Sequence, residues 1–369
     1  MKEIIDNPIF ISGHTRSGTN LLMRLLDGSS GLLSPPGVGK MHTLRRLSWS
    51  SGDGEDNEGR MKRLLGLVEL QLSEEKLQKF RSHLFISVSN APTGFKGDVT
   101  ALLNAIKDYS GFENSKLQKW VEKNHNLEFY WGRVLMAFSN PRLLVMMRDP
   151  RDVWGSWREE CRKNNLDTGK TQMRRNLQQH LFEETVEASL GVSRFKNTPD
   201  ILEYYKVPEK NRTVFNKALS NVMFNGIQGA DVNAEIIDVD AYAHSDNEAG
   251  RFAWNYRIIA ERTMWLVNTY PDKAAIVCYE NLVISPEKMV KQITEFCEIE
   301  IPLNIAPTEI GEQWSGNSSF AANFQGVSTD SVGRWKKRLD DEEVAAIMAV
   351  AGKAYEESVK WQEKALQPG

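Results

Sequence analysis

The sequence of 369 residues lacks the features that mark disulfide-bonded, zinc-binding or membrane-spanning proteins. Its three cysteines, Cys161, Cys278 and Cys297, are widely spaced and form no CxxC pair, which argues against a disulfide framework and a structural zinc site. The six histidines show no metal-ligand spacing. No apolar run approaches the roughly 20 residues that span a bilayer. These absences predict a cytoplasmic protein without a membrane span or a metal site.

A strong charge of one sign is also missing. The net charge is −3, so no overall basic field indicates a nucleic-acid partner. With 41% hydrophobic residues, the chain has enough apolar material for a large core. We find no internal repeat and no convincing linker. We therefore expect residues 1–369 to form a single domain, with residues 158–250 as a helical insertion within it.

Short apolar runs alternate with helical patterns along the chain. Strands are predicted at residues 9–12, 95–99, 143–147 and 274–278. Helices are predicted from Thr19 onward and at residues 60–83, 158–230, 249–269, 287–297 and 341–365, with a loop at 51–59. This alternation predicts a three-layer α/β/α fold, in which helices cover both faces of a mainly parallel central sheet.

The segment ISGHTRSGTN, directly after the first predicted strand, resembles part of a phosphate-binding P-loop. Gly13 and Gly18 have the spacing of G-x-x-x-x-G-K-[ST], but Thr19 and Asn20 replace its last two residues. Arg16 supplies a positive charge within the loop instead. The pattern favours a nucleotide with 5′ phosphate-like groups, no γ-phosphate and no required metal. The alternative is a glycine turn in an unrelated β–α unit.

A second polar cluster follows the predicted strand at 143–147. Arg148 begins the sequence RDPRD, and Ser156 follows eight residues later in a predicted helix. Because the carboxyl ends of parallel strands share one edge, Arg148 should emerge beside Arg16. Two separate anion sites there suit a nucleotide phosphorylated at both ends. The alternative is a charged turn, in which Asp152 caps the helix.

These segments resemble the signatures of sulfotransferases that use 3′-phosphoadenosine 5′-phosphosulfate (PAPS). The sequence RSGTN at 16–20 is similar to the family's [RK]-S-G-T-[TSN] loop, and Arg148 with Ser156 is similar to its second motif. Further similarity lies in YENL at 279–282, NSSF at 317–320 and VGRWK at 332–336. The matches follow the family's order along the chain.

The resemblance implies a P-loop-NTPase-like fold with a helical elaboration and a metal-independent reaction. The enzyme would move a sulfuryl group from PAPS to a hydroxyl or amine of a small-molecule, sugar or lipid acceptor by in-line displacement. The loop would bind the 5′-phosphosulfate, Arg148 and Ser156 the 3′-phosphate, and a late segment the adenine or its ribose. The implied PAPS-binding residues are Arg16, Ser17, Gly18, Thr19, Asn20, Arg148, Ser156, Ser318 and Phe320.

The resemblance also indicates catalytic residues. Arg16 would stabilise the leaving group electrostatically. The sequence KGD at 96–98 resembles the family's K-x-H, so Lys96 would contact the sulfuryl group and Asp98 would replace the histidine base. Asp98 could equally cap a turn. His42 is a rival base, and His14 is a weaker one.

One departure from the family concerns the 3′-phosphate. The usual R-K-G triplet before V-G-x-W is replaced by Ser328-Thr329-Asp330. Either hydroxyls and backbone groups substitute for it, or a nearby cation reaches in, or those cations form a solvated face. The candidate cations are Arg334, Lys336, Lys337 and Arg338. Two other functions stay open: a P-loop kinase using ATP and Mg²⁺, and a catalytically silent nucleotide-binding protein.

Overall fold

A parallel β-sheet forms the centre of the computed structural model, which describes residues 2–26, 31–34, 56–66, 73–111, 117–225, 235–299 and 327–365. Within these residues the sheet has five strands in the order β2-β3-β1-β4-β5, and all neighbouring pairs are parallel. The strands are β1 (Pro8–Gly13), β2 (Leu32–Leu33), β3 (Lys119–Lys123), β4 (Arg142–Met147) and β5 (Ala274–Cys278). The predicted α/β fold class is confirmed.

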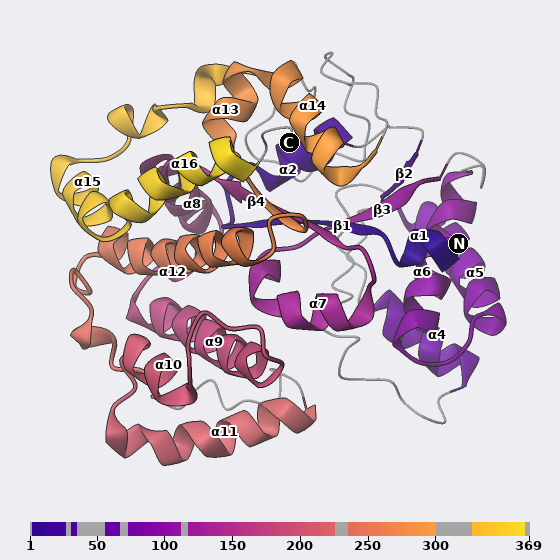
Figure 1. Ribbon diagram of the computed structural model, residues 1–369, viewed down its shortest axis with the longest axis horizontal. Helices are drawn as coiled ribbons and strands as arrows, with labels where there is room; N and C mark the ends of the chain where they lie inside the picture. Colours follow the sequence, from indigo (N-terminus) through magenta and orange to yellow (C-terminus); the bar gives the residue numbers. More distant parts are fainter. Residues whose placement is uncertain are drawn as a thin grey trace.

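Helices cover both faces of the sheet (Figure 1). Phe10, Leu143 and Ile276 point into one apolar core, whereas the alternating residues Ile11 and Leu144 point into the other. The first core includes α5 (Glu74–Asn90), α6 (Phe95–Ser110), α12 (Glu248–Thr269), α15 (Asp341–Ile347) and α16 (Lys353–Ala365). The second core includes α2 (Thr19–Leu26), α13 (Tyr279–Ile284) and α14 (Pro286–Cys297). The molecule therefore has the three layers that the sequence predicts.

A third apolar core lies on the outer side of α12, where the sequence predicts helices over 158–230. It unites α9 (Lys170–Ser189), α10 (Thr198–Tyr204) and α11 (Arg212–Asn225) with the short 3-10 helix Leu127–Tyr130. Within this core, Phe182 and Phe215 stack with ring centroids 5.3 Å apart. In the described part of the chain, no helix combines the length and apolar character needed to cross a membrane.

The strand predicted at residues 95–99 is wrong, because this segment begins α6. Val99, Leu102, Leu103 and Ile106 are buried at helical spacing along α6. This helical period continues through 16 residues and outweighs the short apolar run at its start. The helix predicted at 60–83 is also replaced by two helices, α4 (Asn57–Leu65) and α5, so α4 begins inside the loop predicted at 51–59.

Strand β3 is not predicted by the sequence, because KWVEK contains three charged residues. All five residues are nevertheless buried. The charged ends have partners: Lys119 Nζ lies 3.3 Å from Glu298 Oε2, and Lys123 Nζ donates to Asn20 Oδ1 over 2.6 Å. The remaining helices are α1 (Lys2–Ile5), α7 (Trp131–Ala137) and α8 (Pro150–Lys163).

Candidate functional site

The site lies where β1 and β4 end at the carboxyl edge of the sheet. The loop after β1 leads into α2 at Thr19, while Arg148 follows β4 directly and α8 begins two residues later. Arg148 Nη1 donates to the carbonyl oxygen of Arg16 over 3.2 Å. The prediction that Arg148 emerges beside Arg16 is therefore confirmed.

The loop requires glycine at two positions. Gly13 has a φ of +135°, and a Cβ there would clash with the Met146 carbonyl oxygen of the neighbouring strand β4. Gly18 has a φ of +103°, and a Cβ there would clash with the ring of Tyr279. Arg16 lies between them with a φ of +74°, a left-handed conformation that is uncommon outside glycine. The two close contacts explain the spacing of the glycines in the sequence.

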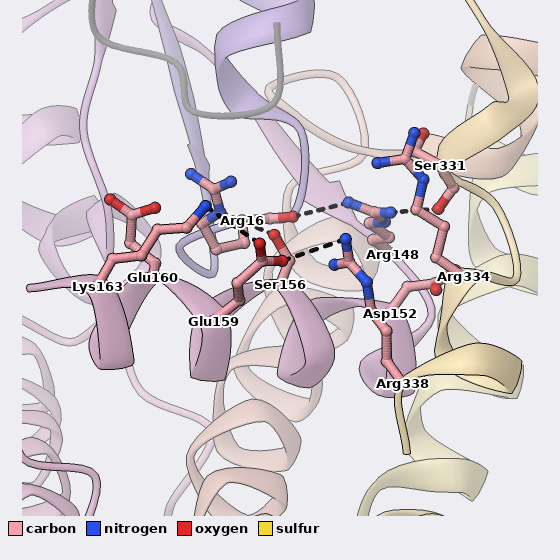
Figure 2. Close-up of a pocket in the computed structure, with 10 residues that line it drawn as sticks. All are labelled: Arg16, Arg148, Asp152, Ser156, Glu159, Glu160, Lys163, Ser331, Arg334 and Arg338. Atoms are coloured by element: carbon pink, nitrogen blue, oxygen red, sulfur yellow. Dashed lines mark hydrogen bonds and ion pairs between the residues drawn. The ribbon is translucent and has the colours of Figure 1, made fainter.

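Arg16, Arg148 and Ser156 line one cavity of about 110 Å³ (Figure 2). Arg16 Nε donates to Ser156 Oγ over 3.0 Å, so the loop and α8 are in direct contact. The sequence predicts two separate anion sites, whereas the structure brings residues of both to this cavity. The difference arises because the side chain of Arg16 extends from the loop to α8.

Positive charge predominates around the cavity. Burial lowers the pKa of Arg16, and nearby Glu160 opposes this shift. Arginine remains protonated at working pH, so the charge persists. The basic residues that line the cavity are Arg16, Arg148, Lys163, Arg334 and Arg338, and the acidic ones are Asp152, Glu159 and Glu160. An anion is the ligand that such a lining favours.

Arg148 is held in place by groups from distant parts of the chain. Its guanidinium lies 4.4 Å from the ring centroid of Tyr279, and its Nη2 donates to the Ser331 carbonyl oxygen over 2.5 Å. Its own carbonyl oxygen accepts a 2.7 Å hydrogen bond from the Tyr256 hydroxyl. Within the described residues, Arg148 Nε and Ser17 Oγ are buried without a hydrogen-bond partner. Of these two hydrogen-bond donors, Arg148 Nε belongs to a residue that lines the cavity.

The segment after Ser328 is attached to α8. Asp152 accepts hydrogen bonds from the backbone N–H groups of Gly333 and Trp335, at 2.7 and 2.8 Å. Arg151 lies over the ring of Trp335, 4.0 Å from its centroid. This attachment brings two of the four candidate cations, Arg334 and Arg338, to the cavity, whereas Lys336 and Lys337 are exposed outside its lining.

The structure does not bring Lys96 and Asp98 to this cavity. Lys96 Nζ lies 2.7 Å from Asp6 Oδ1, and Asp6 precedes β1 at the amino end of the sheet. Asp98 is buried between Arg60 and Arg63, at 2.6 and 2.9 Å. Figure 1 shows α6 beside α1, at the opposite end of β1 from α8. The expected position of KGD at the end of a strand is therefore wrong.

The remaining residues predicted from the sequence are two histidines and two residues near the C-terminal end of the chain, and the structure describes only one of them. His42, Ser318 and Phe320 lie outside the described residues, so their proposed roles stay predictions. His14 is packed among aromatic rings, with its ring centroid 5.0 Å from that of Phe252. Burial lowers the pKa of His14 to about 4, so the ring is neutral near pH 7. His14 consequently has the environment of a packing residue.

Lys123 and His125 also reach the site, although they are not among the residues predicted from the sequence. Lys123 is the last residue of β3, which pairs with β1, and His125 follows two residues later. His125 Nδ1 lies 2.9 Å from the Gly13 carbonyl oxygen. A carbonyl only accepts, so Nδ1 carries the proton and Nε2 of the neutral ring can accept one. The sequence KNH at 123–125 is a complete K-x-H pattern. The sequence therefore contains this pattern, but the strand before it is not predicted because it contains charged residues. Without that strand, the sequence does not indicate that KNH lies at the sheet edge.

A comparison with family models gives a match to part of the chain. A model described as "Sulfotransferase family" matches residues 8–188, a range that includes the loop, Lys123, His125, Arg148 and Ser156. The resemblance predicted from the sequence motifs is therefore confirmed. No curated protein matches the chain at a significant level.

Several solved structures are distantly similar to the chain. One is a sulfotransferase domain from the curacin biosynthetic pathway, with 14% identity over 92% of this chain and 95% of that chain and a TM-score of 0.46. Another is a sulfotransferase domain from the Synechococcus PCC 7002 olefin synthase, with 16% identity over 96% and 94% and a TM-score of 0.49. The sulfotransferase STF9 from Mycobacterium avium has 14% identity over 80% and 64% and a TM-score of 0.30.

Proposed function

We propose that this chain, which matches the sulfotransferase family over residues 8–188, transfers a sulfuryl group from PAPS to a hydroxyl or amine of a small-molecule, sugar or lipid acceptor. The observation that carries the proposal is the convergence of Arg16, Arg148 and Ser156 on one basic cavity beside the glycine loop. PAPS supplies an activated sulfuryl group together with a 3′-phosphate. A nucleotide with both groups suits a loop that continues into an arginine-lined cavity.

The binding roles follow from charge and position. Backbone N–H groups at the start of α2 would contact the 5′-phosphosulfate, as helix N-termini commonly do for anions. Arg148 and Ser156 would bind the 3′-phosphate. Arg16 keeps its proton, so it would stabilise negative charge on the leaving group rather than act as an acid.

His125 would be the general base in this proposal. Its Nε2 would take the proton of the acceptor hydroxyl while the acceptor oxygen forms a bond to sulfur and the bridging oxygen–sulfur bond breaks. The products would be the sulfated acceptor, 3′,5′-adenosine bisphosphate (PAP) and, after the base is regenerated, a released proton. Lys123, which is held by Asn20 at the start of α2, would stabilise charge on the sulfuryl oxygens.

The proposal also includes the domain organisation and the cellular compartment of the enzyme. The chain would form one domain that acts in the cytoplasm, with residues 158–250 as its helical insertion. All three cysteines are buried and none of them forms a disulfide bond, which agrees with a reducing compartment. The third apolar core includes α9, α10 and α11 but also α12, so the helical part shares a helix with the central layers.

Isothermal titration calorimetry with PAP, AMP and ATP, first without metal and then with Mg²⁺, tests the proposal. We expect PAP to bind without metal, more tightly than AMP or ATP. Binding of ATP with Mg²⁺ but not of PAP would overturn the sulfotransferase proposal and favour the kinase. Turnover of labelled PAPS with a panel of hydroxyl and amine acceptors then separates an enzyme from a silent nucleotide-binding protein.

A further inference from the structure

We propose that Arg338 determines specificity for the 3′-phosphate. In the absence of nucleotide, the carboxylate of Glu159 binds Arg338, and the 3′-phosphate competes with this carboxylate for the Arg338 guanidinium. The inference rests on the proposed function. It assigns a cation to the position left without one by the sequence Ser328-Thr329-Asp330. The assignment depends on three observations: how Arg338 is positioned, what it contacts now, and which neighbouring cations are less suitable.

The main chain of Arg338 is fixed against α8. Its carbonyl oxygen accepts a 2.6 Å hydrogen bond from Arg158 Nη2. Its side chain then passes over α8 at Gly155, where an added Cβ would lie 3.6 Å from Arg338 Cδ. The next residue, Ser156, lines the same cavity. The aliphatic part of the Arg338 side chain is therefore packed against α8. Its guanidinium lies beside Ser156 and Arg148, as Figure 2 shows.

The present partner of Arg338 is a carboxylate on the cavity face of α8. Arg338 Nη2 lies 3.1 Å from Glu159 Oε2, and Lys163 Nζ lies 3.1 Å from Glu159 Oε1. Asp152, one turn before Ser156, instead accepts backbone hydrogen bonds from Gly333 and Trp335. Glu159 is thus an acidic group that interacts with a cavity arginine. A phosphate carries more negative charge and more acceptor oxygens than a carboxylate, so it can compete for the Arg338 donors.

Nearby cations are less suitable for this role. Arg334 also lines the cavity, but its Nε donates to the Asp330 carbonyl oxygen and the residue is exposed. Lys336 and Lys337 lie outside the lining and are exposed. The side chain of Arg338 is 33% exposed, so it is accessible to a ligand and partly shielded from water. Lys337 provides a matched control, because it has the same charge and adjoins Arg338 in the chain.

Calorimetric titration of PAP and AMP into the full-length protein tests the inference, because AMP lacks the 3′-phosphate. We expect Arg338→Ala to weaken PAP binding by roughly 10- to 100-fold, the effect of losing a hydrogen bond to a charged group. AMP binding should change by less than about two-fold, and Lys337→Ala should alter neither affinity. Glu159→Gln should strengthen PAP binding several-fold, because it removes the competing charge. Arg338→Lys should restore part of the affinity.

The outcomes separate this inference from the proposed function. If the wild-type protein does not prefer PAP to AMP, the proposed function fails. If it does, but Arg338→Ala retains that preference or loses both ligands equally, only the role of Arg338 is overturned. Thermal unfolding checks that each variant is folded. Glu159→Gln gives an opposite, independent shift, so the inference can be tested even if Arg338→Ala does not fold.

Discussion

Arg16 Nε donates to Ser156 Oγ over 3.0 Å, although 140 positions separate these residues in the chain. The contact exists because β1 and β4 are parallel neighbours in the sheet, so the loop after β1 and the helix after β4 start at the same edge. Sheet topology thus assembles the basic cavity. Five predictions test what its residues and the groups around them contribute.

Arg148→Ala should weaken PAP binding by roughly 10- to 100-fold, because it would remove the charge-assisted hydrogen bonds that we propose between Arg148 and the 3′-phosphate. Calorimetric titration measures the loss. Arg162→Ala is the matched control, since Arg162 is exposed on the same helix, α8, and does not line the cavity. Equal effects of both substitutions would indicate a general loss of positive charge rather than a contact at this position.

His125→Gln should lower kcat by roughly 10²- to 10⁴-fold, the usual contribution of a general base. PAP affinity should stay unchanged, because in the proposed mechanism the histidine acts on the acceptor rather than on the nucleotide. Steady-state turnover of labelled PAPS and calorimetry measure the two quantities. His83→Gln, a change of the same type on α5, should affect neither. Full activity of His125→Gln would leave His42 as the histidine to test.

Gly18→Ala should destabilise the loop, because the new Cβ would meet the Tyr279 ring in a conformation that favours glycine. Tyr279 also stacks on Arg148, so its displacement should weaken PAP binding. Gly111→Ala is a useful comparison, since Gly111 has a φ of +69° with nothing within 4 Å of an added Cβ. Both variants carry backbone strain, but only Gly18→Ala should lose PAP affinity in calorimetry.

Asp98→Ala should lower the free energy of unfolding by about 3–5 kcal/mol, because it leaves the buried Arg60 without its carboxylate partner. Urea unfolding measures this loss, and Asp98→Asn should cost less because it keeps a hydrogen-bond acceptor. The kcat of the folded fraction should remain unchanged. A large fall in kcat with unaltered stability would instead identify Asp98 as the base.

The stability contributed by His14 should depend on pH. Burial lowers its pKa from 6.5 to about 4 in the folded protein, so below pH 6.5 the unfolded chain binds more protons. Stability is therefore lost as pH falls from about 6.5 to about 4, by about 3 kcal/mol at most. His14→Phe should remove this part of the pH dependence, whereas His83→Gln should retain it. Urea unfolding at several pH values gives the comparison.

The parts of the fold that could be predicted from the sequence are those with a clear apolar period. Strand β5 lies at the predicted residues, and β4 and α12 begin within one residue of their predicted positions. In contrast, β3 buries lysines whose partners, Glu298 and Asn20, come from elsewhere in the fold. A local pattern contains no information on such partners, so the strand and the KNH sequence after it were both missed.

The candidate site shows the same division. Glycine spacing predicts the loop, and the position after an apolar strand predicts where Arg148 emerges. The position of Arg338 at the cavity, in contrast, depends on a contact between distant parts of the chain. Asp152 accepts hydrogen bonds from the backbone N–H groups of Gly333 and Trp335, which are more than 180 positions away. That contact is a property of tertiary packing, so the sequence could only name Arg338 among several cations.

Arg148 connects the loop after β1 with the segment after Ser328, because its side chain donates hydrogen bonds to the carbonyl oxygens of Arg16 and Ser331. The family match ends at residue 188, so a fragment confined to it would lack Tyr279 and Ser331. A nucleotide bound in the cavity would consequently contact both the loop after β1 and the segment after Ser328, and so hold them together. Ligand that binds only the folded chain stabilises it by mass action, and here that stabilisation should slow cleavage of the C-terminal segment by proteases.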